Sequence, residues 1–349
     1  MSPSDIGSDH APFSCVIINF NGQHILEKTI ESLQALRTPP AEIILVDDGS
    51  TDRSVAFVKE TYPDVVIEAF AENTARTTRL RNAGLRRASN RFVLVTDNDI
   101  IFEPDSIVSL SEALRRHADA AACTPIVLFN DGSGQVFLSG HDLHYLGWSV
   151  VANEQTLADL QARGDKIAAG CGIAMFDKDR MGNDLYFNEQ LGLGWGDDGE
   201  LHHRMRLYGK ACYRVPTAIV YHQRIRLTHR VAGTVQNRIV FLMTNYATRS
   251  LLILAPALLL FEILLAIYAL LSGTAGDYLA GWRAARREWP AVRLMRAQTQ
   301  ANRTVRDRDL LGAGPLDLRF KSWGGLGIVI QKTLNAFFNL YWMIARALL

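Results

Sequence analysis

Short apolar runs alternate with stretches of helical periodicity over residues 13–99, and this alternation constrains the fold more than any other feature. The runs have the length and β-branched content of buried strands, and lie at Phe13–Phe20, Glu42–Val46, Val65–Ile67 and Val93–Asp97. Between the first two runs, helical spacing is shown by Leu26, Ile30, Leu33 and Leu36. Repeated strand–helix units predict the α/β class, with a doubly wound, mostly parallel sheet and helices on both faces.

Polar side chains stand where these apolar runs end, namely Asn19, Asp47, Asp48, Asp97 and Asp99. Ligands of a doubly wound sheet bind at the carboxyl ends of its strands, so we expect these five residues to lie together. Two carboxylates one residue apart suit a Mg²⁺ or Mn²⁺ ion that is held partly by the phosphates of a substrate. The alternative is a solvated Asp97–Asn98–Asp99 turn that only ends a strand.

The first strand is not followed by a phosphate-binding glycine loop of the G-x-G-x-x-G or G-x-x-x-x-G-K-[ST] kind. This argues against a Rossmann dehydrogenase, a P-loop NTPase and a sugar nucleotidyltransferase. Phosphates would instead be neutralised by a metal and by basic side chains, with Arg79 and Arg81 on the expected helix Thr77–Ala88 as candidates. Ordinary solvated arginines are the alternative for both.

Four motifs in a fixed order resemble family 2 glycosyltransferases of the GT-A fold. They are Val16–Gly22, Leu45–Asp52, Arg81–Gly84 and Val95–Asp99, and the resemblance extends to about residue 240. It implies a nucleotide-sugar donor whose base and ribose lie beside Asp47 and Asp48. It also implies that Asp97 and Asp99 form the D-x-D pair that places a Mn²⁺ or Mg²⁺ ion on the diphosphate, with Asp97 alternatively on the ribose. Asn19 and Arg81 complete the expected donor site.

A second group of acidic residues lies in Gly192–Leu201, where a glycine-rich segment leads into a helix that carries Leu201, Met205 and Tyr208 and ends at Gly209. The glycines predict a mobile loop. Asp197 or Asp198 at a helix N-terminus is also typical of simple capping. The resemblance implies more: Asp197 replaces a glutamate of the family's Glu-Asp pair, and Asp198 is the general base that takes the proton of the acceptor hydroxyl. One base without an enzymic nucleophile implies direct displacement with inversion.

Val220–Tyr221–His222 resembles the end of the family's catalytic domain, where a histidine serves as a further metal ligand. A polar strand end is the alternative for His222. The following Gln223–Leu227 partly matches the Q-x-x-R-W signature of processive polysaccharide synthases, with Leu227 in place of tryptophan. We therefore expect at most a pyrophosphate or lipid-phosphate contact there, and no processivity.

Two further patterns carry weaker signals. His141–Asp142–Leu143–His144 contains metal-binding residue types, but a polar loop is the favoured interpretation. Cys171 lies in the expected strand Lys166–Phe176, whose glycines Gly170 and Gly172 allow close approach of a ligand; a packed thiol is favoured over a nucleophile. The four cysteines are far apart, which indicates reduced thiols rather than disulfides or zinc.

The composition changes after residue 240. Ser250–Ser272 is apolar except for Glu262 and is long enough to cross a bilayer, although Pro256 and Glu262 make an in-plane or re-entrant helix an equal alternative. Basic residues dominate Asp277–Lys321, which predicts contact with anionic headgroups on the cytoplasmic side of a membrane. Residues 327–349 carry polar residues on one stripe (Gln331, Lys332, Asn335, Asn339), as an interfacial amphipathic helix does; an ordinary packed helix is the alternative.

The net charge of +1 gives no global attraction to nucleic acid. The expected organisation is a disordered leader over 1–12, a GT-A catalytic domain over 13–240 and a helical, membrane-associated region over 241–349. The expected function is metal-dependent, inverting transfer of a sugar from a nucleotide-sugar to a hydroxyl of a glycan or lipid-linked acceptor. A non-catalytic, membrane-bound scaffold of the same fold is the rival hypothesis.

Overall fold

The computed structural model describes residues 11–140, 142–150, 156–168, 172–183, 185–223, 230–316 and 324–349. The chain divides into two compact units, each built from several segments. Unit 1 consists of Met1–Gly140, Gln155–Phe187 and Lys210–Leu227. Unit 2 consists of His141–Glu154, Asn188–Gly209 and Thr228–Leu349. The leader expected over 1–12 lies almost wholly outside the described residues.

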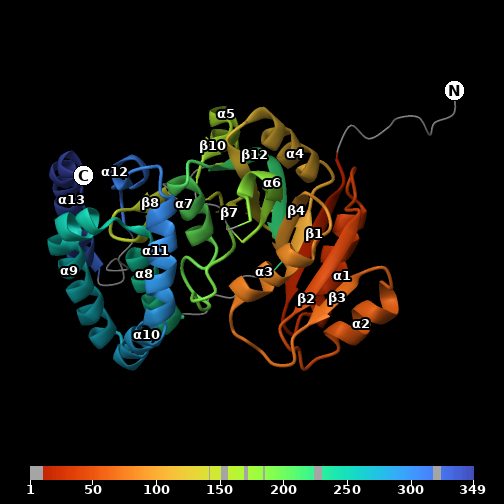
Figure 1. Ribbon diagram of the computed structural model, residues 1–349, viewed down its shortest axis with the longest axis horizontal. Helices are drawn as coiled ribbons and strands as arrows, with labels where there is room; N and C mark the ends of the chain where they lie inside the picture. The colour runs from red at the N-terminus through yellow and green to blue at the C-terminus, as the bar shows by residue number, and fades with distance from the viewer. Residues whose placement is uncertain are drawn as a thin grey trace. The chain divides into compact units, whose positions relative to one another are not determined.

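Unit 1 is built on a ten-stranded sheet, with the strand order β10-β12-β6-β11-β4-β1-β2-β3; β5 pairs with β12 and β7 pairs with β6 (Figure 1). The strands are β1 (Phe13–Asn19), β2 (Glu42–Asp47), β3 (Val66–Ala69), β4 (Phe92–Asp97), β5 (Ile100–Phe102), β6 (Ala120–Phe129), β7 (Val136–Leu138), β10 (Lys166–Ile167), β11 (Ala174–Asp177) and β12 (Ala211–His222). β1 to β4 are joined in parallel, as are β6 and β12, while β5, β7, β10 and β11 pair antiparallel. The predicted α/β class is confirmed.

One strand predicted from the sequence is divided in the structure. The sequence predicts Lys166–Phe176 as a single strand, but its two ends belong to different strands: β10 pairs with β12, whereas β11 pairs with β4 and β6. The apolar period continues across the glycines, so local pattern alone could not separate the two pairings.

Helices cover both faces of this sheet, as the sequence predicted. They are α1 (Gln23–Gln34), α2 (Ser54–Thr61), α3 (Thr77–Arg87), α4 (Ser106–Arg116), α5 (Leu157–Arg163) and α6 (Lys178–Met181). Alternate residues of β1 point to opposite faces of the sheet. On one face, Cys15 and Ile17 pack in the main core cluster with α1, α2 and α4. Val16 meets α3 at Gly84, where a Cβ would come 2.1 Å from Val16 Cγ1, so only glycine lets α3 lie this close.

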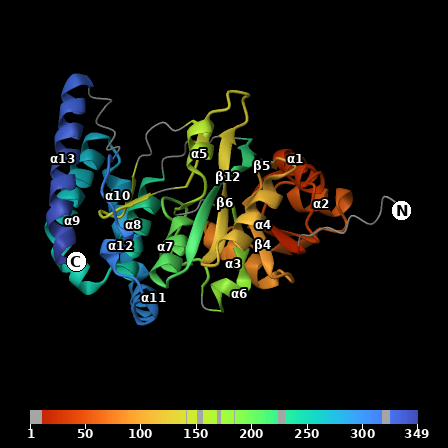
Figure 2. The ribbon, with the colours of Figure 1, turned by 90° about the horizontal axis from the view of Figure 1, so that it is seen from above.

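Unit 2 is mainly helical, with one small hairpin of β8 (Asp142–His144) and β9 (Trp148–Val150) (Figure 2). Its helices are α7 (Gly199–Leu207), α8 (Val231–Asn245), α9 (Thr248–Leu271), α10 (Ala275–Arg287), α11 (Trp289–Asn302), α12 (Asp307–Leu310) and α13 (Gly324–Leu348). Large rings dominate its core, which includes Tyr145, Phe241, Tyr246, Phe261, Phe338 and Trp342. Aromatic packing of this kind fixes the helices around the hairpin.

α9 is, among the described helices, the one that is long and apolar enough to cross a membrane. The test rests on length and composition, and 22% of the apolar window is buried. A core helix of a soluble protein would be mostly buried, so most of this apolar surface faces outward.

Candidate active site

The carboxyl ends of β1, β2 and β4 lie at one edge of the sheet in unit 1 (Figure 1). Asn19 is level with Asp47 across the β1–β2 pair, and Ile18 is level with Asp97 across the β1–β4 pair. Parallel pairing makes the strands end together, so their last residues meet. The structure thus brings the polar strand ends together at the edge where the sequence predicted them.

Asn19 and Asp47 form the centre of a hydrogen-bonded network at this edge. Asn19 Nδ2 donates to Asp47 Oδ2 at 2.8 Å, and Ser50 donates its N–H to Asp47 Oδ1 at 2.8 Å and its hydroxyl to Asp47 Oδ2 at 2.5 Å. Asn98 Nδ2 donates to Asn19 Oδ1 at 2.6 Å. Asn98, to which the sequence pattern assigns no role, therefore links the β4 end to the β1 end.

Asp48 is buried beside this network. Its Oδ1 accepts the Thr74 N–H at 2.9 Å, which connects the end of β2 to the segment after β3. Gly49 has φ +69°, and a Cβ there would lie 2.6–2.9 Å from backbone atoms of Glu72 and Asn73. Glycine is required on both counts. The loop after β2 is thus fixed by packing, with Asp48 held in one orientation.

Arg81 reaches the same edge from α3. It is almost fully buried, and its Nη2 lies 3.3 Å from Asp97 Oδ1. The guanidinium carbon stands 5.5 Å from the ring centre of Phe187. A Cβ on Gly172 would lie 2.6 Å from Arg81 Nη2 and 3.2 Å from Asp97 Oδ2, so this glycine makes room for the ion pair. Gly170 and Cys171 lie outside the described residues.

Asp99 and His222 form a second pair of polar side chains in unit 1, after β4 and at the end of β12. His222 ends β12, whose pairing with β5 sets it level with Ile100, and its Nε2 lies 3.7 Å from Asp99 Oδ2. The Gln223 N–H donates to the Asp99 carbonyl at 2.8 Å. Burial lowers the pKa of His222, and the negative charge of Asp97 opposes this only in part. The imidazole is therefore neutral at pH 7, the form that binds metals.

No three histidine, cysteine or acidic side chains are grouped to hold a metal ion anywhere in the described part of the chain. The pair Asp99–His222 offers one oxygen and one nitrogen donor, a set that suits Mn²⁺. Mg²⁺ or Mn²⁺ in phosphate sites is bound by one or two protein groups, with phosphate and water completing the shell. The donor set therefore fits an ion that arrives with a diphosphate.

Asp198 belongs to unit 2, where it caps α7. Its Oδ1 accepts the Gly199 N–H at 2.7 Å, so the capping interaction considered from the sequence is present. Oδ2 makes no hydrogen bond to the described residues. Leu201 and Met205 are buried and Gly209 ends the helix with φ +76°, as predicted.

The glycine-rich segment before α7, predicted from the sequence as a mobile loop, packs against α8. Asn237 of α8 accepts the Gly192 N–H at 2.9 Å and donates to its carbonyl at 2.8 Å. A Cβ on Gly194 would lie 2.8 Å from the backbone of Gly233 and Thr234. Gly194 therefore permits close packing onto α8.

Trp195 is anchored as well. Its ring stacks on Trp148 at 5.8 Å between centroids, and its Nε1 donates to Ser149 Oγ at 2.8 Å. Behind the α7 N-terminus, Glu200 pairs with Arg204 at 2.9 Å, and both side chains are buried. Asn245 Nδ2 adds a hydrogen bond to Glu200 at 3.2 Å. The sequence analysis did not predict these contacts. Trp195 and Asn245 bind partners that lie far along the chain, and the i,i+4 spacing of Glu200 and Arg204 gives no sign that the pair is buried.

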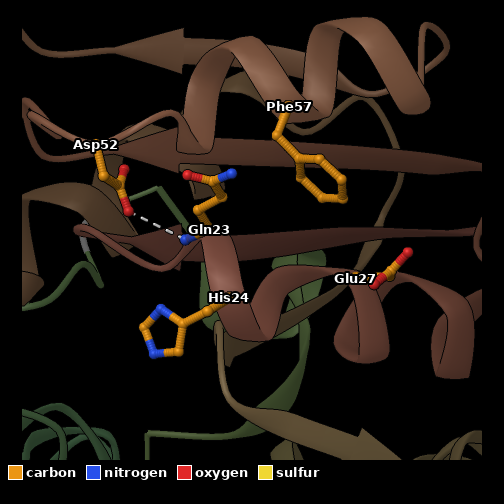
Figure 3. Close-up of a pocket in the computed structure, with 5 residues that line it drawn as sticks. All are labelled: Gln23, His24, Glu27, Asp52 and Phe57. Atoms are coloured by element: carbon orange, nitrogen blue, oxygen red, sulfur yellow. Dashed lines mark hydrogen bonds between the residues drawn. The ribbon is translucent and has the colours of Figure 1, made fainter.

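The weaker candidates of the sequence have a structural role or lie outside the described residues. His144 is buried, and its Nδ1 accepts the Leu146 N–H at 3.2 Å, which is a structural role. His141, Arg224, Arg226 and Leu227 lie outside the described residues. A surface hollow of unit 1 is lined by Gln23, His24, Glu27, Asp52 and Phe57, with the Gln23 N–H donating to Asp52 at 3.1 Å (Figure 3). The carboxylates at the strand ends do not line this hollow.

Comparison with known proteins agrees with this geometry. A sequence model of the family "Glycosyl transferase family 2" matches residues 14–179, which include every strand end described above except β12. This segment is a glycosyl transferase family 2 domain.

Relatives of the family 2 domain are distant and longer. An "Uncharacterized glycosyltransferase YwdF" of Bacillus subtilis is 31% identical over 126 residues, which cover 35% of this chain and 45% of that protein. "Hyaluronan synthase" of Pasteurella multocida is 24% identical over 245 residues, covering 61% of this chain and 25% of the synthase. The chain thus spans less than half the length of these relatives.

A solved structure, "GalNAc-T7 with UDP, GalNAc and Mn2+", aligns with a TM-score of 0.55 at 15% identity, over 69% of this chain and 49% of that one. At this identity the likeness shows the fold alone. It confirms the GT-A type that the order of motifs predicted.

Proposed function

We propose that this protein transfers a glycosyl group from a nucleotide-sugar to an acceptor hydroxyl. The observation that carries the proposal is the strand register of the family 2 domain, which sets Asn19, Asp47 and Asp97 at one edge of the sheet. The hyaluronan and poly-N-acetylglucosamine synthases among the relatives support a cell-envelope glycan as the acceptor class.

The donor site is assigned to this edge. Asp47 and Asp48 bind the nucleoside, held by the Asn19 and Thr74 contacts. Arg81 faces the diphosphate, with Asp97 beside it. Asp99 and His222 hold Mn²⁺ or Mg²⁺, with Asp97 as a further ligand or a ribose contact. The cation, once bound, would neutralise charge on the departing nucleoside diphosphate.

Asp198 is assigned as the general base. A carboxylate suits this role because the attacking hydroxyl loses its proton only as the new bond forms. The capping contact to Gly199 engages Oδ1, and Oδ2 takes the proton. Direct attack on the anomeric carbon then inverts its configuration. NMR of the product decides this point, because a retained configuration contradicts the assignment.

The test is a panel of nucleotide-sugars assayed with Mn²⁺, with donor binding measured separately by calorimetry. Asp198→Asn should lower transfer roughly 10²–10⁴-fold and leave donor affinity unchanged. Asp277→Asn is the matched control, since Asp277 is also an acidic residue at a helix start, in the first turn of α10. Donor binding without turnover by the wild-type protein would favour the non-catalytic scaffold.

We also propose that unit 2 binds a membrane from its cytoplasmic side. The outward apolar surface of α9 supports this partner. Cys15, Cys123 and Cys212 are free and buried, which agrees with a reducing compartment. A lipid-linked acceptor would then be presented at the surface to which the protein is bound.

A further inference from the structure

The two long helices α9 and α13 are each divided lengthwise into a buried and an exposed side. The buried sides carry Leu254, Ala257 and Phe261 on α9, and Phe338, Trp342 and Ala345 on α13. The exposed sides are mainly apolar and carry Leu252, Leu259, Ile263, Ile267 and Leu270 on α9, and Val329, Phe337, Leu340, Met343, Ile344 and Leu348 on α13. This single-sided pattern continues along both helices, each about 36 Å long at 1.5 Å per residue.

α9 and α13 lie side by side at one end of unit 2 (Figures 1 and 2). Tyr341 Oη donates to the Ile253 carbonyl at 2.6 Å, and the rings of Phe261 and Phe338 meet edge to face at 6.0 Å. The polar residues Gln331 and Asn335 of α13 face the protein, where they bind the backbone of Leu316. The apolar residues are thus left on the outside of the pair.

The chemistry of this exposed surface suits lipid. Its side chains are almost all aliphatic, whereas the centres of protein interfaces are enriched in aromatic residues and arginine. The hydroxyl of Thr333, which lies on the exposed side of α13, is satisfied within its own helix by the Val329 carbonyl at 2.9 Å. A polar group in hydrocarbon needs such an internal partner.

The contacts of Glu262 determine how α9 is oriented. In the middle of this helix, Glu262 pairs with Arg238 of α8 and accepts hydrogen bonds from Tyr278 Oη at 2.5 Å and Trp282 Nε1 at 3.0 Å. Both ring donors belong to α10, which turns back after residues 272–274 and runs beside α9. α10 also carries Arg283, Arg286 and Arg287, all exposed. If α9 crossed a bilayer, these three arginines would lie at hydrocarbon depth, which is strongly unfavourable.

The polar residues of α13 also argue against a helix that crosses the bilayer. Lys332, Asn339 and Arg346 recur at every seventh position, so they form one polar line along the helix. Lys332 and Arg346 are exposed. A crossing helix would carry Lys332 into the bilayer, whereas a flat helix keeps Lys332 and Arg346 at the headgroups. Basic side chains there are attracted to anionic lipid.

We infer that α9 and α13 lie flat in a single leaflet, with their exposed apolar sides in the acyl region and Lys332 and Arg346 at anionic headgroups. Neither helix crosses the bilayer. This inference rests on the proposed membrane binding and specifies its geometry. It fixes the protein to one side of the membrane, where only the near leaflet can supply an acceptor.

The depth of single labelled residues in the bilayer tests the orientation of α9 and α13. Nitroxide labels are placed by Leu252→Cys, Leu259→Cys, Leu270→Cys and Leu340→Cys in the full chain, bound to vesicles of phosphatidylcholine with phosphatidylglycerol. Unmodified protein controls for native thiols, of which Cys15, Cys123 and Cys212 are buried. Collision with oxygen and with a water-soluble nickel complex reports depth by paramagnetic resonance. The inference requires the same shallow depth at all four sites.

Three outcomes overturn it. A label at Leu259 much deeper than those at Leu252 and Leu270 shows a helix that crosses. Spin–spin broadening without lipid depth shows a second copy on this surface. Labels that remain in water show that no lipid is bound. Donor binding, measured by calorimetry in the same samples, separates all three from failure of the proposed enzyme function.

Vesicle flotation gives a second measurement that does not depend on labels. Leu259→Glu and Leu340→Glu should each reduce vesicle binding at least about tenfold, since each replaces a leucine buried in lipid by a charged side chain. Both residues are more than half exposed, so the changes leave the core intact. Ile167→Glu, an exposed apolar residue of unit 1, should have no effect. Equal loss in all three variants, or in none, contradicts the inference.

Discussion

The two units use their acidic side chains in different ways. In unit 1, parallel pairing carries Asp47, Asp97 and Asp99 to the edge of a sheet, and Asp97 keeps 36% of its side-chain surface exposed although Arg81 contacts it. In unit 2, Glu200 and Glu262 are each paired with a buried arginine. Buried pairs hold helices together, whereas Asp97 at the strand edge remains accessible to a ligand even though Asp47 beside it is buried.

Asp198 is the exception within unit 2. It is partly exposed and makes no ion pair in the described part of the chain. Next to it, Glu200 is fixed by Arg204 and Asn245. Two neighbouring acidic residues thus separate into a helix anchor and a candidate base. The comparison predicts that substitutions in unit 2 chiefly change stability and those at the unit 1 edge chiefly change function.

The largest effect is expected from Arg204→Met. Removing one partner leaves the Glu200 charge buried and unpaired, which costs about 3–5 kcal/mol of unfolding free energy. Urea denaturation measures this. The control is Arg53→Met, which removes an exposed pair with Glu60 at 3.2 Å and should change stability by less than about 1 kcal/mol. Similar losses in both variants would remove the distinction between the two kinds of pair.

The next largest effect is expected from Asp99→Asn. Weaker metal binding should reduce transfer about 10²–10³-fold, because a bound cation is worth several kcal/mol to the reaction. Stability should change by less than about 1 kcal/mol, since a partly exposed residue is altered. Activity at a series of Mn²⁺ concentrations and thermal unfolding measure the two quantities. Asp64→Asn, an exposed carboxylate of the same unit, is the control; unchanged activity in Asp99→Asn would exclude Asp99 as a ligand.

Sequence analysis predicted the strand edge well because two local rules determine it. A buried strand shows its apolar run directly, and parallel strands end at a common edge whatever the loops do, so Asn19, Asp47 and Asp97 could be placed together. Long-range contacts were not predictable. The glycines of 192–196 gave no sign of the contacts with Asn237 and Gly233, because these residues lie some forty residues later in the chain. The buried pair Glu200–Arg204 was not predicted, because an i,i+4 spacing gives no sign of burial.

A smaller effect is expected from lowering the pH, which should reduce the stability of unit 2 through His144. Burial lowers the pKa of His144 in unit 2 to about 3, from 6.5 for the free side chain. Its contribution to stability is complete above pH 6.5 and is lost as the pH falls towards 3, because only the unfolded chain takes up the proton. Between pH 6.5 and 5 the loss is about 2 kcal/mol. His144→Asn should show a flatter pH dependence in thermal unfolding, and His24→Asn, at an exposed position, should match the wild type. A wild-type slope in His144→Asn would contradict the assignment.

The smallest effect is expected from Asn98→Ala, which tests whether the network at the strand edge orients the donor site. The change removes the 2.6 Å hydrogen bond to Asn19 and leaves the Asn98 carbonyl to accept from Thr29. A lost hydrogen bond of this kind is worth about 1 kcal/mol, or roughly a fivefold decrease in nucleotide affinity. Asn90→Ala is the matched control, since Asn90 makes a 3.0 Å hydrogen bond to Ser14 at the opposite, amino end of β1. Calorimetry with the donor should show weaker binding only for Asn98→Ala; equal weakening in both would mean that sheet stability, not the carboxyl-end network, governs binding.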